Sequence, residues 1–343
     1  MNKEHCKKFQ FLLSIIISVN EEWVKGGVKM IYTVTLNPAI DLFIRTKEMK
    51  PSIVNRTEEY DIQANGKGVN VSFILQKLGI KSTAVGIGGG FTFSYIEEEL
   101  QKKNIATHFF KTTGLTRINV FTRVENDDAE YKLVNDGPTV NDAEKEEFLN
   151  YFEKLAENDL VCISGSFAKG INPSILTIIA QIVQKRKAKL IVDTSYKEVL
   201  DILPFHPLLI KPNEEELTDW FDLQEVPKEK QLIKMAQKLI TKGAQNVLLS
   251  LGADGAILIT KDKIYKGNAP KIEVLNTACS GDSMLGTFIA GIEKKMSLED
   301  NLKASIAAGS DTARMEWITD FVNTKELEKQ IKIINLEGGK END

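Results

Sequence analysis

Apolar and polar residues in the second half of the chain alternate between two patterns. Short apolar runs, which are typical of buried strands, follow longer segments whose apolar residues recur every three or four positions, which is typical of amphipathic helices. The alternation indicates a mostly parallel sheet with helices on both faces, so the predicted fold class is α/β. The predicted pairs of helix and strand are 142–156 with 160–164, 173–185 with 190–193, 197–202 with 208–210, and 230–242 with 246–251.

The first half of the chain contains strand-like stretches that have no helix between them. Two runs, 116–124 and 130–134, flank Asp127-Asp128 and are predicted to form a hairpin. We expect a small separate sheet, or lid, from roughly 41–63 and 116–135, within a single domain that spans 30–335. The other predicted elements are strands at 31–36, 42–45, 58–63 and 82–87 and helices at 71–78 and 95–103.

The two ends of the chain differ from this core. Residues 1–29 contain an apolar run, 9–19, that is too short to cross a bilayer and that no small-residue cleavage site follows. Because the first clear strand begins directly after Met30, we expect 1–29 to be a non-native or disordered extension. The charged tail 336–343 is expected to fray.

Composition and charge exclude several classes of function. The chain has 343 residues and a formal net charge of -4, so it lacks the basic face that non-specific nucleic-acid binding requires. Its three cysteines and three histidines are scattered along the sequence, which argues against a disulfide framework and against a histidine-based zinc site. These features favour an ordinary globular protein of the reducing cytoplasm, without nucleic-acid or membrane partners.

Polar clusters follow several of the predicted strands. In open parallel sheets, ligands bind beyond the carboxyl ends of the strands. The agreement between position and residue type therefore predicts one binding site at this edge of the sheet. The clusters are Asn37, Ser164-Gly165-Ser166, Asp193-Thr194-Ser195, Lys211-Pro212-Asn213 and Gly252.

The stretch 276–286 contains the leading candidate for chemistry. Its small polar residues end in Gly281-Asp282, directly before an apolar pattern with helical spacing. Asp282 in the first turn of a helix either caps free backbone N–H groups or acts as a general base beside N–H groups that bind a phosphoryl anion. Taken alone, the stretch favours the capping role. Cys279 has no histidine near it in sequence, which argues against a cysteine nucleophile.

Two further stretches contain cationic groups suited to an anion. Gly66-Lys67-Gly68 and Asn70 open a predicted helix, where glycines let backbone N–H groups approach an anion and Lys67 adds a positive charge. The alternative is a flexible turn with a solvated lysine. Arg117 and Asn119 point to the same face of a strand, where they hold a phosphate or sugar hydroxyls, or form the solvent face.

Two stretches between residues 211 and 255 suit a nucleotide and its metal ion. Asn213 and Glu216 lie three positions apart at a helix start, so they either organise a hydrated Mg²⁺ or form an acidic first turn. The run from Ser250 to Gly255 is either a strand and a tight turn, or a place where the backbone of Gly252 and Gly255 approaches a nucleotide.

Together these stretches resemble the ribokinase-like (pfkB) carbohydrate kinases, and more narrowly the branch that contains 1-phosphofructokinase and tagatose-6-phosphate kinase. The resemblance extends from Met30 to about residue 330, and several motifs in one order are far more specific than any one of them. The motifs are Asn37–Asp41, Gly66–Val71, Thr116–Val120, Ser164–Ser166, Lys211–Leu217, Ser250–Gly252 and Ser280–Ser283.

The resemblance implies a role for each candidate residue. Asp282 is expected to be the general base, and the backbone N–H groups of Cys279, Ser280 and Gly281 to form an anion hole for the transferring phosphoryl group. Asp41, Gly66, Lys67 and Asn70 are expected to hold the sugar phosphate, with Arg117 and Asn119 contributed by the lid. The expected Mg²⁺ residues are Asn213 and Glu216, and those of the ATP site are Lys211, Ser250, Gly252 and Gly255.

Two positions depart from the family pattern. The family has Gly-Ala-Gly-Asp where this chain has Cys279-Ser280-Gly281-Asp282. If the first of these positions requires a positive φ, the side chain of Cys279 strains the backbone by roughly 1–2 kcal/mol. The substrate loop has Ala64-Asn65 where the branch has two small residues that end in glycine.

The activity that the resemblance implies is ATP-dependent phosphorylation of a ketohexose phosphate. Fructose 1-phosphate is the first choice of substrate and tagatose 6-phosphate the alternative, and Lys67 and Arg117 support a phosphorylated substrate. The rival hypotheses are a ribokinase or nucleoside kinase and a non-catalytic sugar-phosphate sensor. A homodimer through the lid is also expected.

Overall fold

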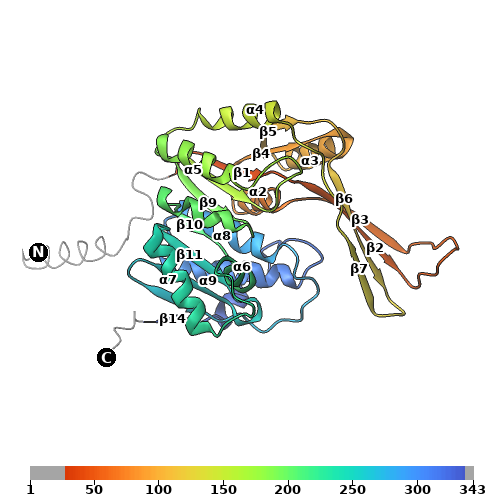
Figure 1. The fold of residues 1–343 in the computed structure, drawn as a ribbon. Helices are drawn as coiled ribbons and strands as arrows, with labels where there is room; N and C mark the ends of the chain where they lie inside the picture. Colours follow the sequence, from red (N-terminus) through yellow and green to blue (C-terminus); the bar gives the residue numbers. More distant parts are fainter. Residues whose placement is uncertain (1–27, 337–343) are drawn as a thin grey trace, which may run out of the picture.

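A computed structural model describes residues 28–336 of the chain. Residues 1–27 of the expected extension and 337–343 of the expected tail lie outside the described part. Within it the chain forms one large and one small sheet (Figure 1). No helix in residues 28–336 combines the length and the apolar character needed to span a membrane.

The large sheet is mostly parallel, as predicted. Its strands from β11 to β5 are parallel to their neighbours, and β12, β13 and β14 add an antiparallel edge. The strands in spatial order are β14 (Ile333–Asn335), β13 (Ile264–Gly267), β12 (Ala256–Thr260), β11 (Asn246–Ser250), β10 (Leu209–Ile210), β9 (Lys189–Asp193), β8 (Leu160–Ser164), β1 (Ile31–Thr35), β4 (Thr83–Gly88) and β5 (Ala106–Lys111).

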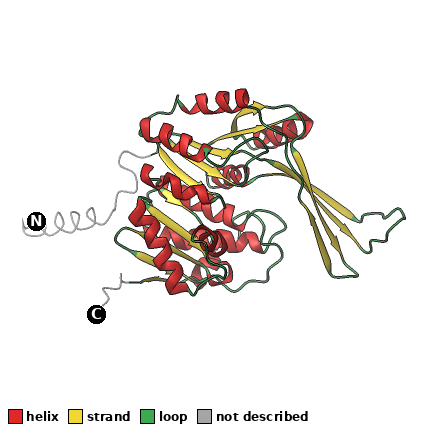
Figure 2. Ribbon diagram, viewed as in Figure 1, coloured by secondary structure: helices red, strands yellow, loops and turns green. Residues whose placement is uncertain are grey.

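Helices cover both faces of this sheet because its central strands are apolar on both sides (Figure 2). In β8, Val161 and Ile163 pack into one core, whereas Leu160 and Cys162 pack into the other. The first face is covered by α4 (Asp142–Phe152), α5 (Ile175–Lys185), η1 (Lys197–Phe205), α6 (Glu214–Trp220) and α7 (Glu229–Lys242). The second face is covered by α2 (Lys67–Lys77), α3 (Gly90–Lys102), α8 (Ser280–Glu293), α9 (Leu298–Ala313) and α10 (Thr324–Gln330).

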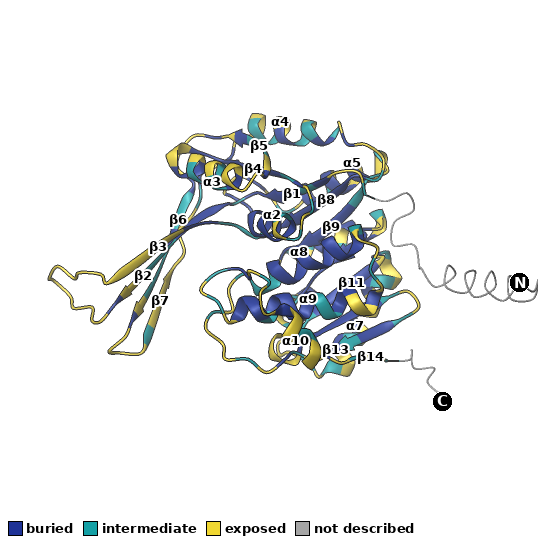
Figure 3. Ribbon diagram, turned by 180° about the vertical axis from the view of Figure 1, so that it is seen from behind, coloured by how far each residue is buried: buried dark blue, intermediate teal, exposed yellow. Residues whose placement is uncertain are grey.

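The small sheet projects from one side of the body (Figures 1 and 3). Its strands, in the order β3 (Glu59–Asn65), β2 (Ala39–Thr46), β6 (Arg117–Val124) and β7 (Ala129–Leu133), confirm the predicted lid and its hairpin. β2 pairs in parallel with β6, so Asp41 stands beside Asn119. The lid therefore brings two of the predicted substrate residues together on one face.

Several elements were not predicted. They are β5, β12, β13, β14, α9 and α10, whereas the short turn η2 (Gly252–Asp254) lies where a tight turn was one of the expected alternatives. In β5, for example, exposed and partly buried positions alternate along most of the strand, so the apolar run of a buried strand is missing.

Candidate active site

The candidate site is a cavity where the carboxyl end of the large sheet meets the lid. Its volume is about 480 Å³. A second cavity of about 280 Å³ shares Gly66, Lys67, Arg117 and Glu216 with it. The predicted residues that line the larger cavity are Asp41, Gly66, Lys67, Arg117, Asn119, Lys211, Asn213, Glu216, Ser250, Cys279, Gly281 and Asp282.

Asp282 is a buried carboxylate in the first turn of α8. No side-chain hydrogen bond caps this helix. Asp282 Oδ2 instead accepts a hydrogen bond from Asn70 Nδ2 at 2.8 Å, so the capping interpretation is wrong. The pKa of Asp282 is raised to about 6, chiefly by burial and also by the charge of Asp193, against the opposing effects of Lys67, Asn70 and Lys211. A carboxylate with such a pKa is suited to general base catalysis near neutral pH.

The loop before α8 has the strain that the sequence predicted. Cys279 has φ +62°, a left-handed conformation that favours glycine. The Ser280 N–H donates to the Thr277 carbonyl at 3.3 Å, so this donor of the predicted anion hole is engaged in the loop. A Cβ added to Gly281 would lie 3.3 Å from Lys211 Nζ, which places an ammonium group beside the start of α8.

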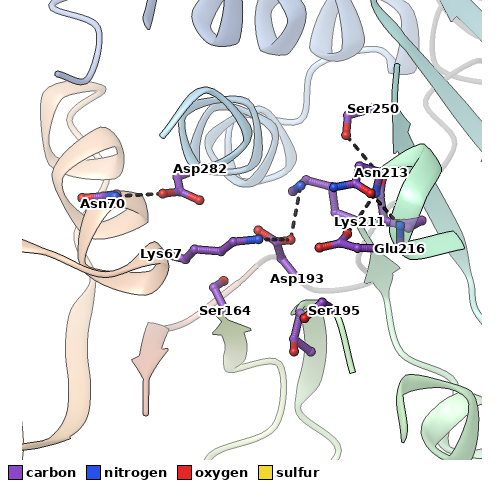
Figure 4. Close-up of polar contacts among 12 residues, drawn as sticks. Lys67, Asn70, Ser164, Asp193, Ser195, Lys211, Asn213, Glu216, Ser250 and Asp282 are labelled. Atoms are coloured by element: carbon purple, nitrogen blue, oxygen red, sulfur yellow. Dashed lines mark hydrogen bonds and ion pairs between the residues drawn. The ribbon is translucent and has the colours of Figure 1, made fainter. Parts of the chain in front are cut away.

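Asp193 is a central residue of the site that was not assigned a role from the sequence. It is fully buried at the end of β9. Its Oδ1 accepts from Lys67 Nζ at 3.1 Å and lies 3.2 Å from Lys211 Nζ (Figure 4). Although burial raises the pKa of Asp193, the two lysines hold it below its ordinary value. The position of the Asp193-Thr194-Ser195 cluster after a predicted strand was the only signal for it in the sequence.

Lys67 lies between the two buried carboxylates. Burial alone would lower its pKa, but the negative charges of Asp193, Asp282 and Glu216 raise it above the ordinary value. Lys67 is therefore a permanent cation at neutral pH. Gly66 holds the start of its helix close to β1, because a Cβ there would lie 2.7 Å from Thr35 Cγ2 and φ is +131°.

The lid supplies a carboxylate whose two oxygens both accept amide hydrogen bonds. Asp41 Oδ1 accepts from Asn119 Nδ2 at 2.8 Å, and Asp41 Oδ2 accepts from Asn65 Nδ2. Burial raises the pKa of Asp41, and these amides together with Arg117 oppose that effect. Asn65 also lines the larger cavity, although from the sequence it was noted only as a departure from the family pattern.

Three polar atoms in residues beside the smaller cavity have no hydrogen-bond partner within the described part of the chain: Thr35 Oγ1, Asn37 Oδ1 and Arg117 Nε. They are shielded from the cavity; Thr35 Oγ1 faces Gly68 and Asn37 Oδ1 faces Gly137. Arg117 donates through Nη2 to the Asn37 carbonyl at 3.1 Å, which keeps its guanidinium in place. Ser164, Ser166 and Ser195 also line this cavity. Hydroxyl, amide and cationic groups in this arrangement suit an anionic group such as a phosphate.

Asn213 and Glu216 form a capping box at the start of α6, so the structural alternative for this pair is confirmed. Asn213 Oδ1 accepts from Glu216 N at 2.7 Å, and Glu216 Oε2 accepts from Asn213 N at 3.0 Å. The box does not use Glu216 Oε1, and Glu216 borders both cavities. Among residues 28–336, no three His, Cys, Asp or Glu side chains are arranged to hold a metal by themselves. A hydrated Mg²⁺ held by one carboxylate and substrate phosphates fits these residues.

Some predicted site residues do not line either cavity. Asn70 lies behind Asp282 and contacts it directly. Gly252 is exposed in η2, and Gly255 packs against β13, where an added Cβ would lie 2.0 Å from the Gly267 carbonyl. The close packing explains why a glycine occupies this turn and gives no support to the predicted contact of Gly255 with ATP.

Residues 33–315 match the sequence pattern of the family described as pfkB family carbohydrate kinase. The chain is 41% identical over 307 residues to D-tagatose-1-phosphate kinase of Bacillus licheniformis and 33% identical over 307 residues to 1-phosphofructokinase of Bacillus subtilis; each alignment covers 90% of this chain and 100% of the relative. The crystal structure of phosphofructokinase-2 from Escherichia coli in complex with fructose-6-phosphate superposes with a TM-score of 0.79 at 27% identity, over 88% of this chain and 98% of that one.

Proposed function

The chain belongs to the pfkB family of carbohydrate kinases, and within this family we propose that it transfers the γ-phosphoryl group of ATP to the 6-hydroxyl of a ketohexose 1-phosphate. Sugar kinases of this family are phosphotransferases that use ATP, generally with Mg²⁺. The proposal adds the position of the substrate phosphate and the residues that do the chemistry. Fructose 1-phosphate and tagatose 1-phosphate are the candidate substrates, because two similar relatives bear those names.

The observation that carries the proposal is a pair of adjoining cavities of different chemistry, the larger of which contains a buried carboxylate. The larger cavity contains Asp282 and Asp41, which suit sugar hydroxyls. The smaller is lined by Lys67, Arg117 and Ser166, whose cationic and hydroxyl groups suit the phosphate that the sugar already carries. A neutral sugar needs no cationic group at this position, whereas a phosphate can pair with the guanidinium of Arg117.

The proposed chemistry begins with the proton of the acceptor hydroxyl. Asp282 Oδ2 is held by Asn70, so Oδ1 is the oxygen that would take this proton. The oxygen of the sugar would then attack the γ-phosphorus while the bond to the β-phosphate oxygen breaks. Lys67 and Lys211, together with the backbone N–H groups at the start of α8, would stabilise the charge on the transferring group.

Asn213 and Glu216 would hold hydrated Mg²⁺ beside the nucleotide phosphates, where the ion would neutralise their charge. Lys211 and Ser250 line the same side of the cavity and would contact the nucleotide. Asp41, Arg117 and Asn119 come from the lid, so binding of the sugar would draw the lid onto the site and exclude water.

The direct test is an assay of ADP release with Mg-ATP and a panel of sugars. The panel contains fructose 1-phosphate, tagatose 1-phosphate, tagatose 6-phosphate, fructose 6-phosphate, fructose and ribose. We expect turnover with one or both 1-phosphates and a 1,6-bisphosphate as product. Turnover only with a 6-phosphate would overturn the position of the phosphate, and turnover with ribose would place the chain elsewhere in the family. Binding of a sugar phosphate without turnover would support the sensor hypothesis.

We also propose that two copies pair through the outer face of the lid. Register places Ile62 and Leu133 in one row of this face and Tyr60 and Tyr131 in the next, and their exposures range from 43% to 67%. A row of exposed apolar and tyrosine side chains without charges can pack against a second copy of itself. Light scattering should give twice the chain mass, and Leu133→Asp should yield monomers; a monomeric wild type would refute the pairing.

A further inference from the structure

Asn65 occupies the floor of the sugar cavity with an amide whose orientation is fixed by its neighbours. Its Oδ1 accepts from Gly66 N at 2.6 Å and from Asn70 Nδ2 at 2.7 Å. Both partners donate, so the oxygen must face them and Nδ2 must face Asp41. Asn65 Nδ2 donates one hydrogen to Asp41 Oδ2, and its other contact is a distant one, 3.9 Å to Cys279 Sγ.

Asp41 and Asn65 therefore present an acceptor and a donor side by side to the cavity. The carboxylate plane of Asp41 is clamped at both oxygens, by Asn119 and by Asn65. The second hydrogen of Asn65 Nδ2 is donated to Cys279 Sγ, at a distance where a hydrogen bond is weak. A sugar hydroxyl placed there would be a better acceptor for this hydrogen, while the neighbouring hydroxyl would donate to Asp41.

An adjacent acceptor and donor distinguish two vicinal hydroxyls by their relative configuration. Hydroxyls on the same face of a furanose ring reach both groups at once, whereas hydroxyls on opposite faces allow only one to reach them. In the furanose form, the hydroxyls at C3 and C4 are on the same face in D-tagatose and on opposite faces in D-fructose. The two candidate 1-phosphates differ at C4 alone.

We propose that Asn65, together with Asp41, binds the hydroxyls at C3 and C4 of the sugar and makes the enzyme selective for the tagatose configuration. Asn65 acts as a specificity-determining residue that contacts the sugar but does not take part in phosphoryl transfer. The inference rests on the proposed function, because it needs a ketohexose 1-phosphate in the cavity. It also accounts for a side chain at a position where the family has glycine.

The test compares kcat/KM for D-tagatose 1-phosphate and D-fructose 1-phosphate in wild type and two variants. Asn65→Ala removes the donor, and Asn119→Ala is the matched control, because it removes the equivalent amide from the other oxygen of Asp41. We expect wild type to prefer the tagatose substrate. Asn65→Ala should reduce kcat/KM for D-tagatose 1-phosphate by roughly tenfold or more. It should change kcat/KM for D-fructose 1-phosphate by less than about threefold. Asn119→Ala should reduce both to a similar extent.

Two outcomes overturn this assignment and leave the proposed function intact. One is a wild type that prefers fructose 1-phosphate, which needs no variant to establish. The other is an equal loss for both substrates in Asn65→Ala, which would show that the residue only positions its neighbours Asp41, Gly66 and Asn70. If wild type phosphorylates neither 1-phosphate, the proposed function fails and this inference fails with it.

Discussion

Replacing Asp282 with asparagine is expected to abolish phosphoryl transfer and to stabilise the fold at neutral pH. The pKa of Asp282 is raised from 3.8 to about 6, chiefly by burial. A carboxyl group whose pKa is higher in the folded than in the unfolded state stabilises the fold while it is protonated. This contribution is complete below the pKa of the unfolded state and is lost as pH rises through the pKa of the folded state. At about 1.4 kcal/mol per pH unit, ionisation of Asp282 lowers the free energy of unfolding by at most about 3 kcal/mol at pH 7.

The asparagine is neutral at every pH, and its amide oxygen can keep the hydrogen bond from Asn70. The variant should therefore melt above wild type near pH 7, by roughly 2 °C per kcal/mol, and the difference should vanish near pH 4. Thermal unfolding at both pH values measures this, and the ADP-release assay measures the loss of kcat. Asp159→Asn is a matched control, because Asp159 is also buried but accepts the Ala156 N–H at the opposite edge of the sheet.

A difference in Tm that is the same at both pH values would show that ionisation of Asp282 is not the cause. A variant that melts below wild type near pH 7 would show that the carboxylate stabilises the folded state. Normal kcat in the variant would remove Asp282 from the role of general base, whatever its effect on stability.

Three further substitutions test the rest of the site. Asp193→Asn leaves Lys67 and Lys211 without their shared carboxylate, so it should cost roughly 3–5 kcal/mol of stability in denaturant unfolding. It should also lower the pKa of Asp282, which Asp193 raises, and move the acid limb of the kcat/KM profile from near pH 6 to lower pH; an upward move would contradict this. Lys67→Ala should lower kcat, because Lys67 would stabilise the transferring group, and should raise KM for the sugar phosphate far more than for ATP; equal effects on the two KM values would refute its contact with the sugar phosphate. Cys279→Gly should stabilise the fold by roughly 1 kcal/mol and raise Tm, because it relieves the left-handed strain; an unchanged or lower Tm would contradict this.

The parallel core could be predicted because its strands are buried on both faces and read as unbroken apolar runs. β8 and β9 are of this kind. The antiparallel edge was missed because β12 and β13 have no helix between them, so the alternation that identified the other strands stops there. Helix α9 was missed because it is buried along small and polar residues, such as Ser305 and Asp311, which give no amphipathic stripe.

The site residues could be predicted one stretch at a time, but their contacts could not. Lys67 and Asp282 are in separate motifs, and each motif shows the type of chemistry. Asp193 has no such motif, and its importance comes from the convergence of two lysines from α2 and the end of β10 on one oxygen. Asn65 was visible only as an unexpected side chain, because its role depends on the direction in which its amide faces Asp41.

Asp193 explains how the site combines a phosphate-binding charge with a base of useful strength. In the proposed function, Lys67 and Lys211 attract and stabilise phosphoryl oxygens, but both lower the pKa of Asp282. With those two cations alone, Asp282 would be a weaker base, because a lower pKa reduces its affinity for the proton of the acceptor hydroxyl. The negative charge of Asp193 opposes them and, with burial, keeps the pKa near 6. The same burial makes the ionised Asp282 unfavourable for stability, so the strength of the base and the loss of folding free energy have one physical cause.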